Sequence, residues 1–172
     1  MNDVSLLEML NARELRCQLQ QHLLRKYKKT LICLTLNIPG PVKVLPGVPA
    51  AYATGCRRIE ESLKKSLVPI CHLETLKEKT GYEAFYCVDA SPEFIKEQMI
   101  AIEDQDELGR LYDIDVLRQD GSKVSREELG LDARKCLLCD NPAHVCSRSR
   151  THSVTELVVR IGDILTPEKG HT

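Results

Sequence analysis

The hydrophobic residues of this chain switch repeatedly between a helical spacing and a strand spacing, and this switching restricts the fold more than any other feature. Leucines recur every three or four positions from Val4 to Lys28, which predicts a long amphipathic helix. Residues 30–38 (TLICLTLNI) are rich in branched side chains and end at a Pro-Gly-Pro sequence, so we expect a strand that runs into a tight loop. A chain that mixes both periods is predicted to be α+β.

The same alternation continues toward the C-terminus. We expect helices at residues 50–65, 92–106 and 151–165 and strands at residues 70–76, 84–88 and 110–118. Ser91 stands before Pro92, where its hydroxyl can cap the second of these helices. This order favours a mixed β-sheet with packed helices. A length of 172 residues with 42% hydrophobic composition suits a single domain over residues 1–172.

The charge balance and the cysteines restrict the partners and the compartment. Lys and Arg number 24 against 25 Asp and Glu, so no overall field attracts nucleic acid or an anionic membrane, and we expect neither partner. The apolar runs are shorter than the ~20 residues of a membrane span. The eight cysteines are mostly scattered and no secretory leader pattern is present, which indicates a cytoplasmic protein with reduced thiols.

The sequence Asp113-Ile114-Asp115-Val116 is the most informative for chemistry. A two-residue step along a strand points both carboxylates to the same face. Two adjacent like charges are tolerated when a divalent cation neutralises them, and Mg²⁺ suits carboxylates that also meet substrate phosphates. Asp113 and Asp115 are therefore candidate catalytic and magnesium-binding residues. The alternative is a solvated strand face, because so short a motif arises often by chance.

A cysteine-rich stretch follows the predicted strand. Its candidate zinc ligands are Cys136, Cys139, His144 and Cys146, since thiolates and imidazole are the ligands of tetrahedral zinc. The stretch from 136 to 152 is expected to be a Cys/His/Arg-rich loop within the domain. The alternative is a tight loop of buried, reduced cysteines, because free cysteine is among the most buried residue types.

Basic residues next to this stretch are candidates for binding phosphate. Arg148, Arg150 and His152 precede a predicted helix, where guanidinium groups and free backbone N–H groups can hold phosphate oxygens. The alternative is a solvated basic helix start. Other candidate substrate-binding residues are Lys43, Arg57 and Arg110.

Four segments together resemble one family. They are LNARELR (10–16), LTLNIPGPVK (34–43), GRLYDIDVLRQDG (109–121) and RKCLLCDNPAHVCSRSRTH (134–152). In order and spacing they resemble the apo-citrate lyase phosphoribosyl-dephospho-CoA transferases, also called holo-citrate-lyase synthases. The resemblance implies transfer of the phosphoribosyl-dephospho-CoA group from triphosphoribosyl-dephospho-CoA to a serine of the acyl carrier subunit, with release of diphosphate.

The resemblance also implies a nucleotidyltransferase-like fold and site. Asp113 and Asp115 match the aspartate–apolar–aspartate–apolar pattern of that superfamily, and Arg148, Arg150 and His152 would then steady the diphosphate. Gly109-Arg110 is the nearest counterpart of the Gly-Ser turn that many nucleotidyltransferases carry. A third carboxylate often completes such sites, and Asp89 and Glu156 are the candidates.

Two other functions remain open at this stage. The first is the same transfer to another carrier, such as that of malonate decarboxylase. The second is a non-catalytic zinc-knuckle interaction module that binds an acidic partner through Arg148 and Arg150, for which Asp113 would be dispensable.

Overall fold

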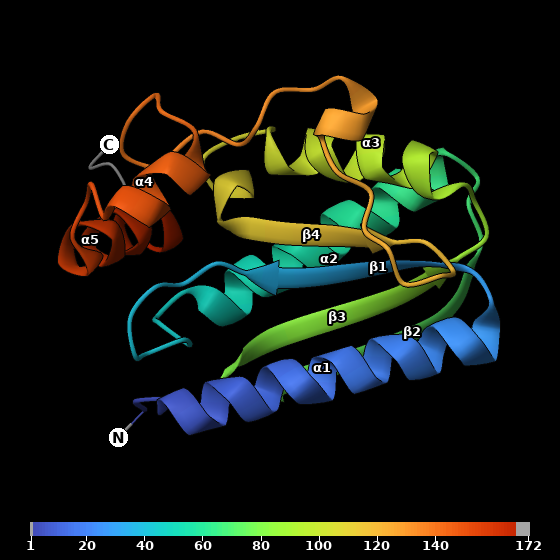
Figure 1. Cartoon of the computed structure of the whole chain (residues 1–172), viewed down its shortest axis with the longest axis horizontal. Helices are drawn as coiled ribbons and strands as arrows, with labels where there is room; N and C mark the ends of the chain where they lie inside the picture. The colour runs from blue at the N-terminus through green and yellow to red at the C-terminus, as the bar shows by residue number, and fades with distance from the viewer. Residues whose placement is uncertain (1, 168–172) are drawn as a thin grey trace, which may run out of the picture.

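The computed structural model describes residues 2–167 as five α-helices around one four-stranded sheet (Figure 1). The strands are β1 (Thr30–Leu36), β2 (Ile70–Glu78), β3 (Gly81–Val88) and β4 (Tyr112–Leu117). The helices are α1 (Leu6–Tyr27), α2 (Val48–Lys65), α3 (Pro92–Glu103), α4 (Ala143–Ser149) and α5 (Val154–Leu165). The α+β class is confirmed. Residues 1 and 168–172 of the range predicted as one domain lie outside the described part of the chain.

The sheet has the order β2-β3-β1-β4, and the three pairings between these strands are antiparallel. A mixed sheet was expected because a helix separates β1 from β2, and such a connection brings the second strand back in the same direction. These two strands do run in the same direction. However, β3 lies between them and pairs antiparallel with both, so they form no parallel pair.

The helices cover the two faces of the sheet unequally. The larger core cluster lies between the sheet and the helices α2 and α3, and includes Ile59, Met99 and Ile114. The second cluster lies under the C-terminal half of α1, where Leu23 and Leu24 pack on Leu31 and Phe85. In Figure 1, α1 runs along β3, and β4 is the strand drawn farthest from it.

The long first helix is confirmed and has no break, but its apolar face is buried only toward the C-terminal end, and Leu6, Leu7, Leu10 and Leu15 are exposed. Ser5 and Glu8 form a capping box at its start, and Lys28 ends it in a left-handed conformation, with its backbone N–H bonded to Leu24. No helix within residues 2–167 has both the length and the apolar character needed to cross a bilayer.

The edge strand β4 is held from the side by α3 rather than by another strand. The backbone N–H of Ile114 donates to the Glu103 carboxylate at 3.1 Å, and its carbonyl accepts from Lys96 at 2.9 Å. Both side chains are buried, so these polar groups satisfy the edge without solvent. This arrangement holds the backbone of β4 firmly between its two aspartates.

Two predicted segments differ from the structure. Residues 136–152 are not a continuous loop, because α4 forms within them. The periodic pattern missed it because a seven-residue helix repeats its apolar face only once. Arg110, predicted to begin a strand, lies in the 3₁₀ turn Gly109–Leu111 that leads into β4.

Candidate active site

Asp113 and Asp115 point to the same face of the sheet, as the two-residue step predicts. Tyr112, Ile114 and Val116 alternate with them and are fully buried against α2 and α3. The aspartates therefore face the α1 side, where Leu117 at the end of β4 joins the α1 core while both aspartates remain partly exposed. Asp115 is opposite Cys33 of β1, and Asp113 is opposite Thr35.

Each aspartate has a different cationic neighbour. The Asp115 carboxylate lies 2.9 Å from the ammonium group of Lys123. Asp113 is farther from its neighbour, with its Oδ1 atom 3.9 Å from a guanidinium nitrogen of Arg134. Burial, and then the charge of Asp115, raise the pKa of Asp113 above its usual range. A further cation beside Asp113 would stabilise its charged form.

Glu83 of β3 brings a third carboxylate to this face. Only 8% of Glu83 is exposed, and Arg16 of α1 forms an ion pair with it. Glu83 and Asp113 line the same cavity. The prediction did not find Glu83, although its position alternates with Phe85 and Cys87, whose side chains face α1.

The two carboxylates suggested as a third member lie elsewhere. Asp89 follows the far end of β3, where it pairs with Lys29 at 3.2 Å. Glu156 belongs to the capping box of α5 and accepts from the backbone N–H of Ser153 at 3.1 Å. Neither lines the cavity that contains Asp113.

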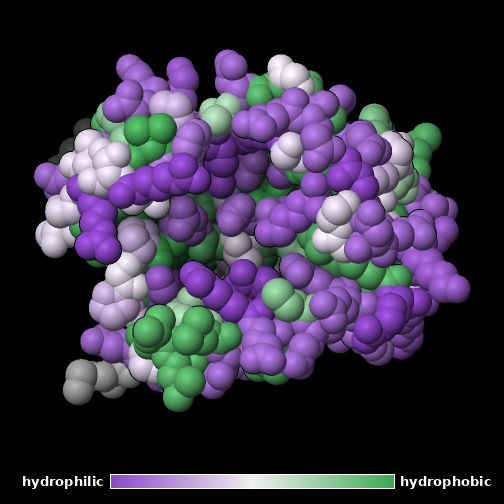
Figure 2. Space-filling model, in the orientation of Figure 1, coloured by the Kyte–Doolittle hydropathy of each residue, from purple (hydrophilic) through white to green (hydrophobic). Residues whose placement is uncertain are grey.

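Two cavities lie on this side of the molecule. The smaller, of about 180 Å³, is lined by Asp113 and Glu83 together with Arg13, Arg16 and Lys43. The larger, of about 640 Å³, lies under the C-terminal third of the chain and is lined by Arg110, Arg134, Lys135 and Arg150. Asn37 lines both cavities. In Figure 2 this face is hollowed over β1 and β4, and hydrophilic side chains border the hollow.

The predicted phosphate-binding residues divide into two groups. Arg110, Arg150 and His152 line the larger cavity, and Lys43 lines the smaller one, where its ammonium group donates to the Ile38 carbonyl at 2.7 Å. Burial, and then the charge of Arg13, lower the pKa of Lys43. Two residues lie away from both cavities. Arg57 is exposed on α2 and pairs with Glu61 at 3.4 Å, and Arg148 is exposed on α4.

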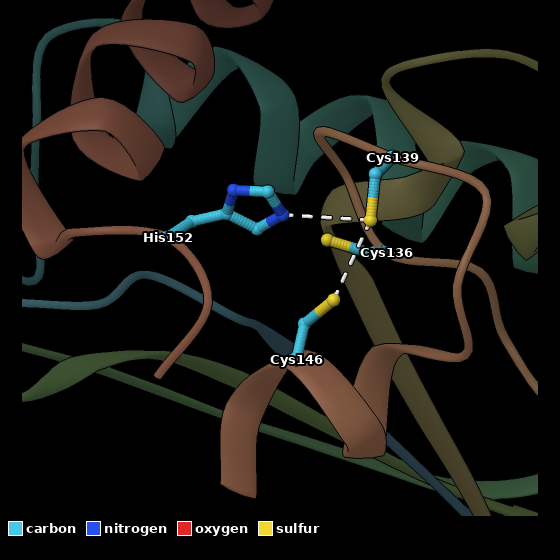
Figure 3. A group of neighbouring side chains, drawn as sticks. All are labelled: Cys136, Cys139, Cys146 and His152. Carbon is cyan, nitrogen blue, oxygen red and sulfur yellow. Dashed lines mark hydrogen bonds between the residues drawn. The ribbon is translucent and has the colours of Figure 1, made fainter. Parts of the chain in front are cut away.

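Three cysteines and one histidine converge beside the larger cavity (Figure 3). They are Cys136, Cys139, Cys146 and His152, and their ligand atoms all lie within 4.8 Å of one another. The Cys139 sulfur is 3.4 Å from the Cys146 sulfur and 3.4 Å from Nε2 of His152. This group is able to hold a metal ion.

The predicted ligand set changes at one position, because His152 lies where His144 was expected. His144 and Cys146 are two residues apart in α4, and a helix turns by about 200° over that step. With Cys146 buried, His144 points to solvent. His152 reaches the group because Arg150 ends α4 in a left-handed conformation and Thr151 bonds back to Cys146 at 3.2 Å.

The thiols of this group show opposite pKa changes. Burial opposes ionisation of Cys136, but the backbone N–H groups of Leu138 and Cys139 outweigh it and lower the pKa. Loss of solvent and the neighbouring thiols raise the pKa of Cys146 to about 11. Adjacent thiolates repel each other, so all three ionise together only around a cation.

Comparison with known proteins gives one consistent result. A family model described as apo-citrate lyase phosphoribosyl-dephospho-CoA transferase matches residues 4–167. A Vibrio cholerae protein named "probable apo-citrate lyase phosphoribosyl-dephospho-CoA transferase" is 38% identical over 162 residues, covering 94% of this chain and 91% of its own length. A Streptococcus pyogenes protein with the same name is 37% identical over 166 residues, covering 94% of this chain and 85% of its own.

Proposed function

The chain belongs to the apo-citrate lyase phosphoribosyl-dephospho-CoA transferase family, and from this premise we propose the complete reaction that its site supports. The donor is triphosphoribosyl-dephospho-CoA, and the acceptor is a serine of the acyl carrier subunit of apo-citrate lyase. Diphosphate is the second product. The enzyme is thus a nucleotidyltransferase in its chemistry, and its carboxylate pair on a strand supports a nucleotidyltransferase-like fold.

In this reaction the serine oxygen of the carrier attacks the phosphorus atom nearest the ribose. A new phosphorus–oxygen bond forms, and the bond to the bridging oxygen of the diphosphate breaks with its electron pair. The serine proton passes to a carboxylate of the pair or to water. The chain itself forms no covalent intermediate, so its residues need only hold the donor, the acceptor and the developing charge.

The observation that carries this proposal is the position of Asp113, which lines the smaller cavity and lies 3.9 Å from Arg134, a residue that lines the larger one. The larger cavity has a volume typical of sites that bind a cofactor-sized ligand. Arg110, Arg134 and Arg150 supply fork-shaped donors for phosphate oxygens along its wall. A donor seated there would direct its triphosphate toward Asp113.

Asp113 and Asp115 are suited to Mg²⁺, because carboxylate oxygens and substrate phosphates are its preferred ligands. Burial and the charge of Asp115 raise the pKa of Asp113, and a divalent cation beside the pair would offset both effects. When bound, Mg²⁺ would neutralise the triphosphate and favour departure of the diphosphate. Lys123 stays beside Asp115 and holds that carboxylate in place. Soft thiols such as those of the cysteine group do not suit Mg²⁺.

The family and the site together favour the transferase over a zinc-knuckle interaction module. An interaction module gives no reason for two adjacent carboxylates on one strand face, one of them with a raised pKa. We also propose a cytoplasmic location, since the eight cysteines are free thiols, which a reducing compartment preserves.

The test is the intact mass of the apo carrier subunit after incubation with this protein, Mg²⁺ and triphosphoribosyl-dephospho-CoA. The carrier should gain the mass of the phosphoribosyl-dephospho-CoA group, and diphosphate should appear in equal amount. Asp113→Asn should abolish the gain, and Asp132→Asn, which changes an exposed aspartate, should not. No gain with a carrier that a relative modifies would reject the function. A gain that survives Asp113→Asn would reject the assigned site.

A further inference from the structure

We propose that Cys136, Cys139, Cys146 and His152 bind one zinc ion in a closed tetrahedral site that holds the segment 134–153 in place. All four ligand atoms come from this short part of the chain. In Figure 3 the three sulfur atoms and the imidazole point toward a common centre. No open position for substrate is needed, so the ion is structural rather than catalytic.

The distances suit zinc. Around a tetrahedral zinc ion, bond lengths of ~2.3 Å to sulfur and ~2.0 Å to nitrogen place neighbouring ligand atoms about 3.5–3.8 Å apart. The sulfur atoms of Cys139 and Cys146 are 3.4 Å apart, and Nε2 of His152 is 3.4 Å from the Cys139 sulfur. A disulfide requires about 2.0 Å, so these sulfurs are not bonded to each other.

The surroundings of the ligands also favour a metal. The backbone N–H of Leu138 points at the Cys136 sulfur at 3.5 Å, which stabilises a thiolate. Nδ1 of His152 lies 4.0 Å from the Glu156 carboxylate, while Nε2 faces the cysteines. A carboxylate behind one ring nitrogen favours the tautomer in which the other is free to bind metal. Thiolate and imidazole together select zinc over the hard ions.

The segment 134–153 requires such a bond because it has almost no core of its own. Within it, only Cys136 and Cys146 are buried. Its one helix, α4, has seven residues, whereas isolated helices shorter than about 12 residues are marginal in water. Two backbone bonds close its first loop, from Cys136 N–H to Asn141 and from Ala143 N–H to Arg134. Metal binding in a poorly packed segment contributes directly to folding.

The position of the site gives the metal a consequence for function. Cys136, Cys146 and His152 line the larger cavity, and so do Arg134 and Arg150 from the same segment. The Arg110 guanidinium also donates to the Cys136 carbonyl at 3.2 Å. The ion therefore positions arginines of the larger cavity. If these arginines hold the donor, as in the proposed function on which this step rests, loss of the ion should raise the KM for donor more than it lowers kcat.

The test is the zinc content of the full-length protein, purified without added metal and measured by elemental mass spectrometry. About one zinc per chain is expected for the wild type. Cys139→Ser and His152→Ala should lose it, whereas His152→Cys should keep it, because a fourth thiolate still completes a tetrahedron. The matched controls are His144→Ala, an exposed histidine of the same segment, and Cys71→Ser, an exposed cysteine of β2, and both should keep their zinc.

Cobalt gives a second readout that does not depend on activity or on the stability of a variant. Co²⁺ added to chelator-treated wild-type protein should produce the sulfur charge-transfer and intense ligand-field absorption of a tetrahedral site. Loss of zinc from His144→Ala to the same extent as from Cys139→Ser would overturn the ligand set. A Cys139–Cys146 disulfide in the wild type with no bound zinc would overturn the site. Full zinc without carrier modification would reject the proposed function and leave the zinc site standing.

Discussion

Arg134 links the carboxylate of Asp113 to the buried carboxylate of Glu103, lying 3.9 Å from the first and 3.5 Å from the second. Glu103 in turn accepts the backbone N–H of Ile114, which lies between the two aspartates. Arg134 also donates to the Arg110 carbonyl at 2.7 Å. One side chain thus connects the start of the cysteine segment, the edge strand and the site.

Replacing Arg134 with alanine should slow carrier modification by about 10²-fold, because a fixed guanidinium beside developing phosphate charge is lost. The free energy of unfolding should fall by only about 1–2 kcal/mol, since Glu103 keeps its 3.0 Å pair with Arg126. Rates by intact mass and melting curves separate the two effects. Arg57→Ala is the control, because that exposed arginine pairs with the neighbouring Glu61, lies away from both cavities and should change neither quantity. Equal rates for both variants would remove Arg134 from the site.

Asp113→Asn should separate activity from stability. Transfer should fall by at least about 10²-fold because a metal-binding oxygen is lost. The melting temperature in the absence of Mg²⁺ should stay level or rise. Burial and the negative charge of Asp115 both disfavour the charged form of Asp113, and asparagine removes that charge. A mutation that damages the fold would lower both quantities together. That joint loss is the outcome that would assign Asp113 a structural role.

The raised pKa of Asp113 also predicts a pH dependence. Above the ordinary value of 3.8, folded Asp113 keeps its proton while the unfolded chain has released it. The folded state binds more protons in this window, so the contribution of Asp113 to stability falls as pH rises through the folded pKa. Mg²⁺ affinity should move the opposite way and increase with pH, because the protonated acid cannot bind the ion. Mg²⁺ titrations followed by melting temperature from pH 4 to 8 should show this trend in the wild type and lose most of it in Asp113→Asn.

Local patterns in the sequence account for most of the elements and for the direction of the aspartate pair. Alternation in YDIDVL predicts both a strand and two carboxylates on one face, and the structure places Asp113 and Asp115 accordingly. Strand order could not be predicted in the same way. Whether β3 lies between β1 and β2 depends on contacts between residues far apart in sequence, which local periodicity does not contain.

The rest of the candidate site is non-local in the same sense. Glu83 and Arg134 approach Asp113 from two other parts of the chain; alternation in β3 gives the direction of Glu83, but only the strand order brings it near Asp113. The choice of His152 over His144 depends on α4, a helix too short to show its period. Had that helix been recognised, the two-residue step from His144 to Cys146 would have excluded His144 from the ligand set.

Gly109 starts the 3₁₀ turn before β4, and a larger side chain there should disturb the strand that carries both aspartates. A Cβ atom at this position would lie 2.4 Å from the Ile102 carbonyl oxygen and 2.8 Å from that of Glu103. Backbone atoms cannot move aside as a flexible side chain does. Gly109→Ala should therefore destabilise the protein by about 1–3 kcal/mol and lower transfer, because Glu103 must shift away from the Ile114 N–H.

Gly162 of α5 is the matched control for this substitution. Among the described residues, and apart from its chain neighbours and the adjacent backbone of α5, no atom lies within 4 Å of a Cβ placed there. Gly162→Ala should stabilise the helix by up to about 1 kcal/mol, because alanine has the higher helix propensity. Melting curves of the two variants should move in opposite directions from the wild type. If Gly109→Ala has the same melting temperature as the wild type, the turn can relax without moving β4. The close packing of Gly109 on Ile102 then does not hold the strand that carries the aspartates in position.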